Sequence, residues 1–230
     1  MRPIFNINKM IFIFVVLMTF ALSLTCVSAV DFNNESVTDL SGFNDDNAVG
    51  EFSTQTNGIY SDVSDGTFTD LQSEINNAPE GSVLKLNRNY CGSEGAVVNL
   101  NKNLTIDGQG HTIDCLEDDC QAFYSSSGTI TLKNLKITNS YGSDLSSLHY
   151  GAIYITGSAK YTIENCVFEH NIVHDEHGGA ICHHGEQLNI TNCQFINNRG
   201  EHGGAIFIAG SSRYTIENCV FKDNYAFVFG

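Results

Sequence analysis

Basic side chains are scarce in this chain. Its 230 residues include 11 Lys and Arg against 26 Asp and Glu, so the formal net charge is −15 at pH 7. A surface this acidic repels nucleic acids and anionic membranes, so we expect neither as a partner. The same charge balance disfavours the binding of a polyanionic sugar chain.

Several sequence patterns are also missing. The repeats described below have no apolar spacing of i, i+3, i+4 and i+7 over ten or more positions, which excludes a solenoid of helices. The eight cysteines include no C-x-x-C pair, which argues against a structural zinc site. We find no serine or cysteine nucleophile motif and no phosphate-binding loop. No cofactor and no catalytic residue is therefore expected.

What the chain does contain is repetition. An eleven-residue segment occurs three times, at Tyr161–Asn171 (YTIENCVFEHN), Leu188–Asn198 (LNITNCQFINN) and Tyr214–Asn224 (YTIENCVFKDN). A second motif, G-A-I or G-G-A-I, alternates with it and begins at Gly151, Gly178 and Gly203. Repeats of this period indicate stacked units that cannot bury their apolar faces alone.

The repeated segments have the composition of short strands separated by turns. They are rich in Ile, Val, Thr, Tyr and Phe and are interrupted by Asn and Gly. We interpret Asn165, Asn192 and Asn218 as corners, because Asn tolerates the left-handed backbone that a sharp turn requires. After the corner, Cys166 and Phe168 point inward, and the later repeats follow the same pattern.

Stacking of these units predicts an all-β fold, a right-handed parallel β-helix of about five to six turns. Successive strands would lie about 4.7–4.9 Å apart. One inward column is predicted to contain Ile106, Leu132, Ile163, Ile190 and Ile216. The wider spacing between Leu132 and Ile163 indicates an insertion, which we expect to bulge out within Asn139–Ser147.

The chain before the repeats is divided into two parts. Residues 1–29 have the pattern of a secretory signal peptide, with Arg2 and Lys9 before an apolar run and Val27-Ser28-Ala29 as the cleavage site. The apolar run, Met10–Leu24, is shorter than a membrane span. Residues 30–66 are acidic and poor in apolar side chains, which predicts a disordered leader. The β-helix is predicted over residues 67–230.

Both ends of the predicted β-helix need protection from solvent. At the first turn, Thr69–Gln72 fits a capping box and Leu71, Ile75 and Ala78 share one face, which predicts a short helix that ends at Pro79. At the other end, Gly230 falls where the next G-G-A-I motif should begin. We therefore expect further repeats of the same polypeptide beyond Gly230; the alternative is a Phe-rich tail that folds over the last turn.

The paired F-x-x-N and G-G-A-I motifs resemble those of polymorphic outer-membrane protein repeats. Together with L-T-I-D-G-Q-G-H-T-I at Leu104–Ile113, they make Thr67–Gly230 similar to right-handed β-helix adhesin-like proteins of methanogenic archaea. The resemblance implies a secreted or cell-surface protein that makes contact with cells, matrix or glycans. Its implied partner is an extracellular protein or glycan, and no catalysis is implied.

Five of the eight cysteines fall into two groups. Cys166, Cys193 and Cys219 should stack in one inward column, where parallel Cβ vectors suit a disulfide badly, so we expect buried thiols. Cys115 and Cys120 join the ends of an acidic loop and are the better candidates for a disulfide.

A column of histidines is predicted beside the glycine turns. His149, His177 and His202 each precede a G-A-I motif, and Glu176 and Glu201 flank the later two. Imidazoles one turn apart with carboxylates nearby could bind a transition metal. The alternative, an incidental column of exposed polar side chains, is the interpretation that the sequence favours, because repeat arrays align any repeated residue.

A polysaccharide lyase or hydrolase is the alternative function, because such enzymes also use this scaffold. They need clustered carboxylates for acid–base chemistry. The one dense cluster contains Asp114, Glu117, Asp118 and Asp119, which we place in a solvated loop. Asp107-Gly108-Gln109-Gly110 resembles a corner found in such enzymes but is expected to serve as a tight turn.

Overall fold

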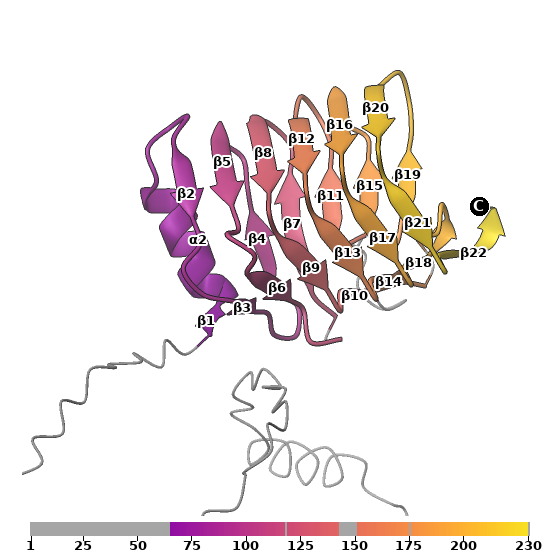
Figure 1. Ribbon diagram of the computed structural model, residues 1–230, viewed down its shortest axis with the longest axis horizontal. Coiled ribbons are helices and arrows are strands. Elements are labelled where there is room, and N and C mark those ends of the chain that lie inside the picture. The colour runs from indigo at the N-terminus through magenta and orange to yellow at the C-terminus, as the bar shows by residue number, and fades with distance from the viewer. Residues whose placement is uncertain (1–64, 118, 143–150, 175, 230) are drawn as a thin grey trace, which may run out of the picture. The chain divides into compact units, whose positions relative to one another are not determined.

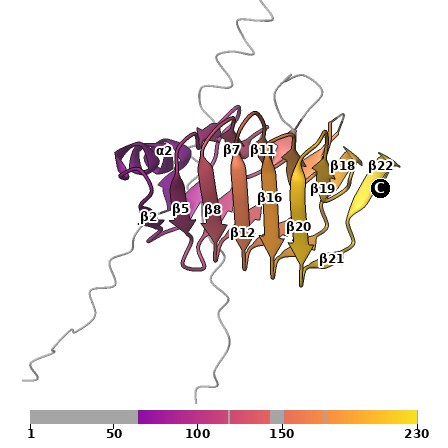
Figure 2. The ribbon, with the colours of Figure 1, turned by 90° about the horizontal axis from the view of Figure 1, so that it is seen from above.

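The computed structural model describes residues 65–117, 119–142, 151–174 and 176–229, which form a parallel β-helix of about six turns (Figures 1 and 2). The predicted signal peptide, nearly all of the predicted leader, His149 and Asp118 lie outside these residues. Gly66, assigned to the leader, instead belongs to the first strand of the fold.

Each turn adds one parallel strand to each of several sheets. The six-stranded sheet contains β2 (Val83–Lys85), β5 (Leu104–Asp107), β8 (Thr129–Lys133), β12 (Lys160–Glu164), β16 (Gln187–Thr191) and β20 (Arg213–Glu217). The seven-stranded sheet contains β1 (Gly66–Thr67), β3 (Tyr90–Cys91), β6 (Thr112–Asp114), β9 (Lys136–Thr138), β13 (Val167–Glu169), β17 (Gln194–Ile196) and β21 (Val220–Lys222).

Two smaller sheets complete the turns. The five-stranded sheet contains β4 (Val97–Asn99), β7 (Gln121–Ser125), β11 (Ile153–Ile155), β15 (Ile181–His183) and β19 (Ile206–Ile208). The four-stranded sheet contains β10 (Tyr141–Gly142), β14 (Ile172–Val173), β18 (Arg199–His202) and β22 (Tyr225–Phe229). Tyr141 and Gly142, expected in a bulge, are thus paired in a strand, because the later turns continue their sheet.

The core consists of identical positions stacked in register. The predicted aliphatic column is confirmed: Ile106, Leu132, Ile163, Ile190 and Ile216 pair directly, one strand after another. The rings of Phe168, Phe195 and Phe221 form a second column, with successive centroids 4.9 Å apart and planes within 7° of parallel. The inward side chains of one turn therefore pack against their counterparts in the next.

The corner positions also behave as predicted. Asn134, Asn165, Asn192 and Asn218 all have left-handed backbone angles, with φ between 52° and 55°. Asn is the residue other than Gly that accepts this conformation most readily, which explains its recurrence before the inward cysteine.

A buried asparagine ladder, formed by the last residue of each F-x-x-N motif, runs through the later turns. Asn171 and Asn198 are fully buried. The side-chain amide of Asn171 donates to Asn198 Oδ1 at 2.9 Å, and that of Asn198 donates to Asn224 Oδ1 at 2.9 Å. Each amide also donates to a backbone carbonyl, at Ile137 and Phe168 respectively. The ladder satisfies polar groups that would be costly if left unpaired in the core.

The predicted capping helix is present as α2 (Phe68–Asn77), and its buried face includes Leu71 and Ile75. The capping box was placed wrongly, however. It consists of Thr67 and Asp70, not Thr69 and Gln72. Thr67 is the last residue of β1 and retains an extended backbone, which is the conformation that an N-cap needs.

The inward side chains of the last described turn are open to solvent. Tyr214 is 58% exposed and Phe221 is 50% exposed, whereas the equivalent Tyr161 and Phe168 are buried. The expectation of further repeats stays a prediction. Within residues 65–117, 119–142, 151–174 and 176–229, no helix has the length and hydropathy of a membrane span.

We predict that Asn198→Ala lowers the free energy of unfolding by about 3 kcal/mol, because it leaves the backbone N–H and a side-chain N–H of Asn171 and the carbonyl oxygen of Phe168 without partners. Urea unfolding measures this change. Asn189→Ala, on the outer side of β16, is the matched control and should cost less than about 1 kcal/mol. Equal losses in both variants would contradict a stabilising role for the ladder.

Candidate functional site

The outer face of the five-stranded sheet carries a row of rings. Parallel pairing places Tyr124, Tyr154, Cys182 and Phe207 at equivalent positions in four successive strands. Their neighbours in each strand point into the core, since Ile153, Ile155 and Ile181 are fully buried. The alternation of a strand therefore directs Tyr124, Tyr154, Cys182 and Phe207 outward.

His184 continues this row where Cys182 has no ring. Its imidazole lies 5.9 Å from the ring of Tyr154 and 5.9 Å from that of Phe207, and Tyr154 lies 5.7 Å from Tyr124. The tyrosines and Phe207 are partly exposed and His184 is exposed. We call Tyr124, Tyr154, His184 and Phe207 the aromatic row.

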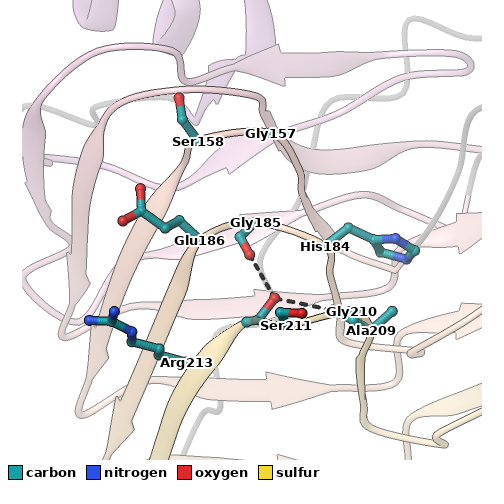
Figure 3. Close-up of a pocket in the computed structure, with 10 residues that line it drawn as sticks. Gly157, Ser158, His184, Gly185, Glu186, Ala209, Gly210, Ser211 and Arg213 are labelled. Carbon is teal, nitrogen blue, oxygen red and sulfur yellow. Dashed lines mark hydrogen bonds between the residues drawn. The ribbon is translucent and has the colours of Figure 1, made fainter.

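A surface hollow of about 460 Å³ adjoins the aromatic row (Figure 3). It is formed where three successive turns stack, and small residues leave the space. Its lining consists of Gly157, Ser158, His184, Gly185, Glu186, Ala209, Gly210, Ser211, Ser212 and Arg213. His184 belongs to both the hollow and the aromatic row, which makes the two surfaces continuous.

The hollow is polar on the side away from His184. Figure 3 shows Glu186 and Arg213 across the hollow from the imidazole. Glu186 forms an ion pair of 3.1 Å with Lys160 from the preceding turn. The hydroxyl of Ser212 lies 2.6 Å from the carbonyl oxygen of Gly185, which holds two adjacent turns together. The arrangement offers hydrogen-bond donors and acceptors next to the rings of the aromatic row.

The aromatic row was not identified from the sequence. A signal for part of it was present, because Tyr154 and Phe207 lie between inward-facing residues that follow the second motif, in Ile153-Tyr154-Ile155 and Ile206-Phe207-Ile208. Alternation within these three-residue strands predicts that the middle ring is exposed. What the sequence could not show is that His184 supplies a ring where Cys182 lacks one.

The histidine column is partly confirmed. The rings of His177 and His202 lie 4.8 Å apart, on successive turns. Glu201 joins them, and the potential ligand atoms of the three side chains all lie within 4.8 Å of one another. His149 lies outside the described residues.

A histidine that the sequence did not single out lies in the core. His183 is paired with Ile155 and Ile208 and is fully buried, and among the described residues neither of its ring nitrogens has a hydrogen-bond partner. Burial, followed by the nearby charge of His184, lowers the pKa of His183 to about 4. The imidazole is therefore neutral at physiological pH and acts as a core side chain.

The inward cysteine column contains free thiols, as predicted. Cys166 and Cys193 are buried, and Cys219 in the last turn is partly exposed. The backbone N–H of Cys166 donates to Cys193 Sγ at 3.4 Å. Contact with Cys193 and burial raise the pKa of Cys166, so this thiol is a poor nucleophile.

The predicted Cys115–Cys120 disulfide is wrong for this structure, in which both residues are free and buried. Each instead pairs through its backbone with the next turn, where Cys115 N–H donates to Thr138 O and Cys120 N–H donates to Tyr141 O. The two thiols pack together in the core. Burial and contact with Cys120 raise the pKa of Cys115 well above its usual range.

Asp114 of the acidic cluster and Asp107 of the neighbouring corner both have structural partners. Asp114 accepts hydrogen bonds from Leu116 N–H and from the Asn139 side chain, which shape the acidic loop. Asp107 is buried and accepts from Asn134 at 2.9 Å, and this bond lowers its pKa. These contacts hold corners of the β-helix in place, as expected for the Asp107–Gly110 turn.

Comparison with known families agrees with this architecture. The family described as "Right handed beta helix region" matches residues 28–229. The chain therefore belongs to the right-handed β-helix family, and its right-handed solenoid fold is as predicted. Searches of curated proteins and of solved structures found no match to the chain. The family includes enzymes and non-enzymes, so it defines the scaffold and leaves the activity to the side chains.

The buried His183 predicts a specific dependence of stability on pH. Because its pKa falls from about 6.5 in the unfolded chain to about 4 in the fold, protonation favours unfolding. The contribution of neutral His183 to the free energy of unfolding is fully present above pH 6.5. As the pH falls toward 4, the free energy of unfolding decreases by about 3 kcal/mol.

His183→Ile should remove this component and raise stability at pH 5 relative to the unmodified protein, since Ile matches its neighbours in the column. Urea unfolding at pH 7.5 and pH 5 measures the difference. His111→Gln, a partly exposed turn residue, should leave the pH dependence unchanged. An identical pH dependence with and without His183 would contradict the prediction.

Proposed function

We propose that this protein is a secreted or cell-surface, adhesin-like β-helix that binds a neutral extracellular glycan without cleaving it. The observation that carries the proposal is the aromatic row beside the polar hollow. Partly exposed rings on successive turns form a continuous row in which neighbouring ring planes are inclined by 40° to 84°, and the apolar faces of sugar rings pack against exposed aromatic rings of this kind. The hydroxyl groups of the sugar can then pair with the polar groups of the hollow.

The dimensions of the surface favour a chain of sugars over a single residue. The aromatic row extends over four strands, from Tyr124 to Phe207, and successive strands lie about 4.8 Å apart. An extended ligand lying across the turns would contact several rings at once. The net charge of −15 makes a neutral glycan a better partner than a polyanionic one.

The proposed location follows from the N-terminal sequence. Residues 1–29 have the pattern of a signal peptide, and the repeats resemble those of adhesin-like surface proteins. A parallel β-helix suits display, because its stacked turns keep outward side chains at regular spacing.

Polysaccharide cleavage is the alternative that the test must separate from binding. Hydrolysis of a glycosidic bond generally needs two carboxyl groups on opposite sides of the bond. Among the described residues that line the hollow, Glu186 is the one carboxylate, and it is paired with Lys160. This arrangement supports binding over hydrolysis.

Glycan-array screening followed by calorimetry tests the proposal. We expect Tyr154→Ala and Phe207→Ala each to weaken binding of the selected glycan about fivefold, the equivalent of about 1 kcal/mol for one aromatic contact. Tyr214→Ala is the matched control, because Tyr214 is 58% exposed but lies on the six-stranded sheet. Binding by that variant should be unchanged.

Two results would overturn the proposal. One is the absence of binding to any neutral glycan, or equal weakening in the Tyr214→Ala control. The other is release of shortened products from the selected glycan, detected by chromatography and abolished by Glu186→Gln, which would establish an enzyme.

A further inference from the structure

The cluster formed by His177, Glu201 and His202 is separate in chemistry from the aromatic row. We propose that these three side chains bind a divalent transition-metal ion of the zinc class. The proposal does not depend on glycan binding. It follows from the way the fold brings residues of two successive turns together.

Equivalent backbone positions place the two imidazoles side by side. Each histidine precedes a glycine with a left-handed backbone, since Gly178 and Gly203 both have φ of 67°. Side chains cannot readily replace glycine there, because an added Cβ at Gly178 would lie 2.1 Å from the carbonyl oxygen of Ile181. The turn that presents the first histidine is therefore repeated one turn later and presents the second.

Backbone hydrogen bonds hold the two turns in this relation. Gly178 N–H donates to the carbonyl oxygen of His202 at 2.9 Å, and Glu201 N–H donates to that of Glu176 at 2.8 Å. The segment that carries His177 is thus paired with β18, which carries the other two ligands. Main-chain hydrogen bonds between the two turns therefore help to position the ligands.

The end of β18 directs two neighbouring side chains toward the same place. Its register with β22 shifts between Gly200 and His202, so the regular alternation of the strand is interrupted. Glu201 Oε1 lies 3.9 Å from His202 Nε2, and both side chains approach His177. All three side chains are partly exposed, which leaves a path for an ion to enter.

The His177 ring is packed and incompletely satisfied. Its centroid lies 4.3 Å from that of Phe207 and 4.8 Å from that of His202, so neighbouring rings restrict its orientation. Its Nδ1 atom is buried and has no hydrogen-bond partner within the part of the chain that the structure describes. A buried ring nitrogen without a hydrogen-bond partner lowers the stability of the fold. A small rotation of the ring toward an ion would move this nitrogen out of its unsatisfied position.

The donor set selects the class of ion. Two imidazoles and one carboxylate are typical ligands of Zn²⁺ and related transition metals, whereas Ca²⁺ and Mg²⁺ prefer oxygen ligands alone. Bonds of about 2.0–2.2 Å place tetrahedral ligands about 3.3–3.6 Å apart. The ligand atoms here lie within 4.8 Å of one another, so modest side-chain rotations suffice. Three protein ligands leave a fourth position for water or an external group.

Calorimetric titration of the purified protein with Zn²⁺ tests the site. We expect one zinc ion to bind. The double variant His177→Gln/His202→Gln should bind zinc at least about tenfold more weakly, because removal of a residue that only hydrogen-bonds to a metal ligand can already weaken metal binding by that factor. Glu201→Gln should weaken binding as well and covers the case in which the double variant fails to fold. His111→Gln, in the turn before β6, is the matched control and should bind zinc unchanged.

Two further measurements identify the ligands. The Co²⁺-loaded protein should show the visible absorption of a nitrogen- and oxygen-ligated ion without a sulfur-to-cobalt charge-transfer band. Zinc should raise the urea midpoint of the unmodified protein and of His111→Gln, but not that of the double variant. The proposal is overturned by an absence of zinc binding, by thiolate ligation, or by binding that persists unchanged when His177, His202 and Glu201 are replaced.

Discussion

The structure depends on the stacking of each inward side chain against its counterpart one turn away. Apolar columns do this through contact, as in the parallel rings of Phe168, Phe195 and Phe221. The asparagine ladder does it through hydrogen bonds, because the amide of one turn is the partner of the next. A polar group can be buried in this way only if the same residue recurs at the same position, which explains why the sequence repeats so closely.

The same register that forms the core also aligns the exterior. Once Ile153 and Ile206 are stacked inside, the residues that follow them are aligned outside, and rings at those positions form a continuous surface. The turns are aligned as well, so glycine and serine at equivalent corners combine into one hollow. The candidate binding surface and the histidine cluster are both products of this alignment. Neither requires a loop of its own.

Most of the fold was predictable because it depends on local rules repeated in sequence. Left-handed Asn165, the inward Cys166 and the aliphatic columns all followed from strand alternation and turn chemistry. The errors concern contacts between turns. The N-cap of α2 lies two residues earlier because β1 delivers Thr67 in an extended conformation. The sequence predicted a Cys115–Cys120 disulfide, whereas both residues are free and buried.

By itself the sequence determined the period, the corners, the inward columns and the acidic charge, because these are set by residue type and spacing along one chain. Only the tertiary structure decided which outward side chains meet. His184 completes the aromatic row beside Cys182, because the register between turns brings its ring to those of Tyr154 and Phe207. The sequence already aligned His177 with His202 and placed Glu201 beside them, but only the structure, through the irregular end of β18, brings their potential ligand atoms within 4.8 Å of one another. Such contacts depend on distances between separate turns, which no local pattern specifies.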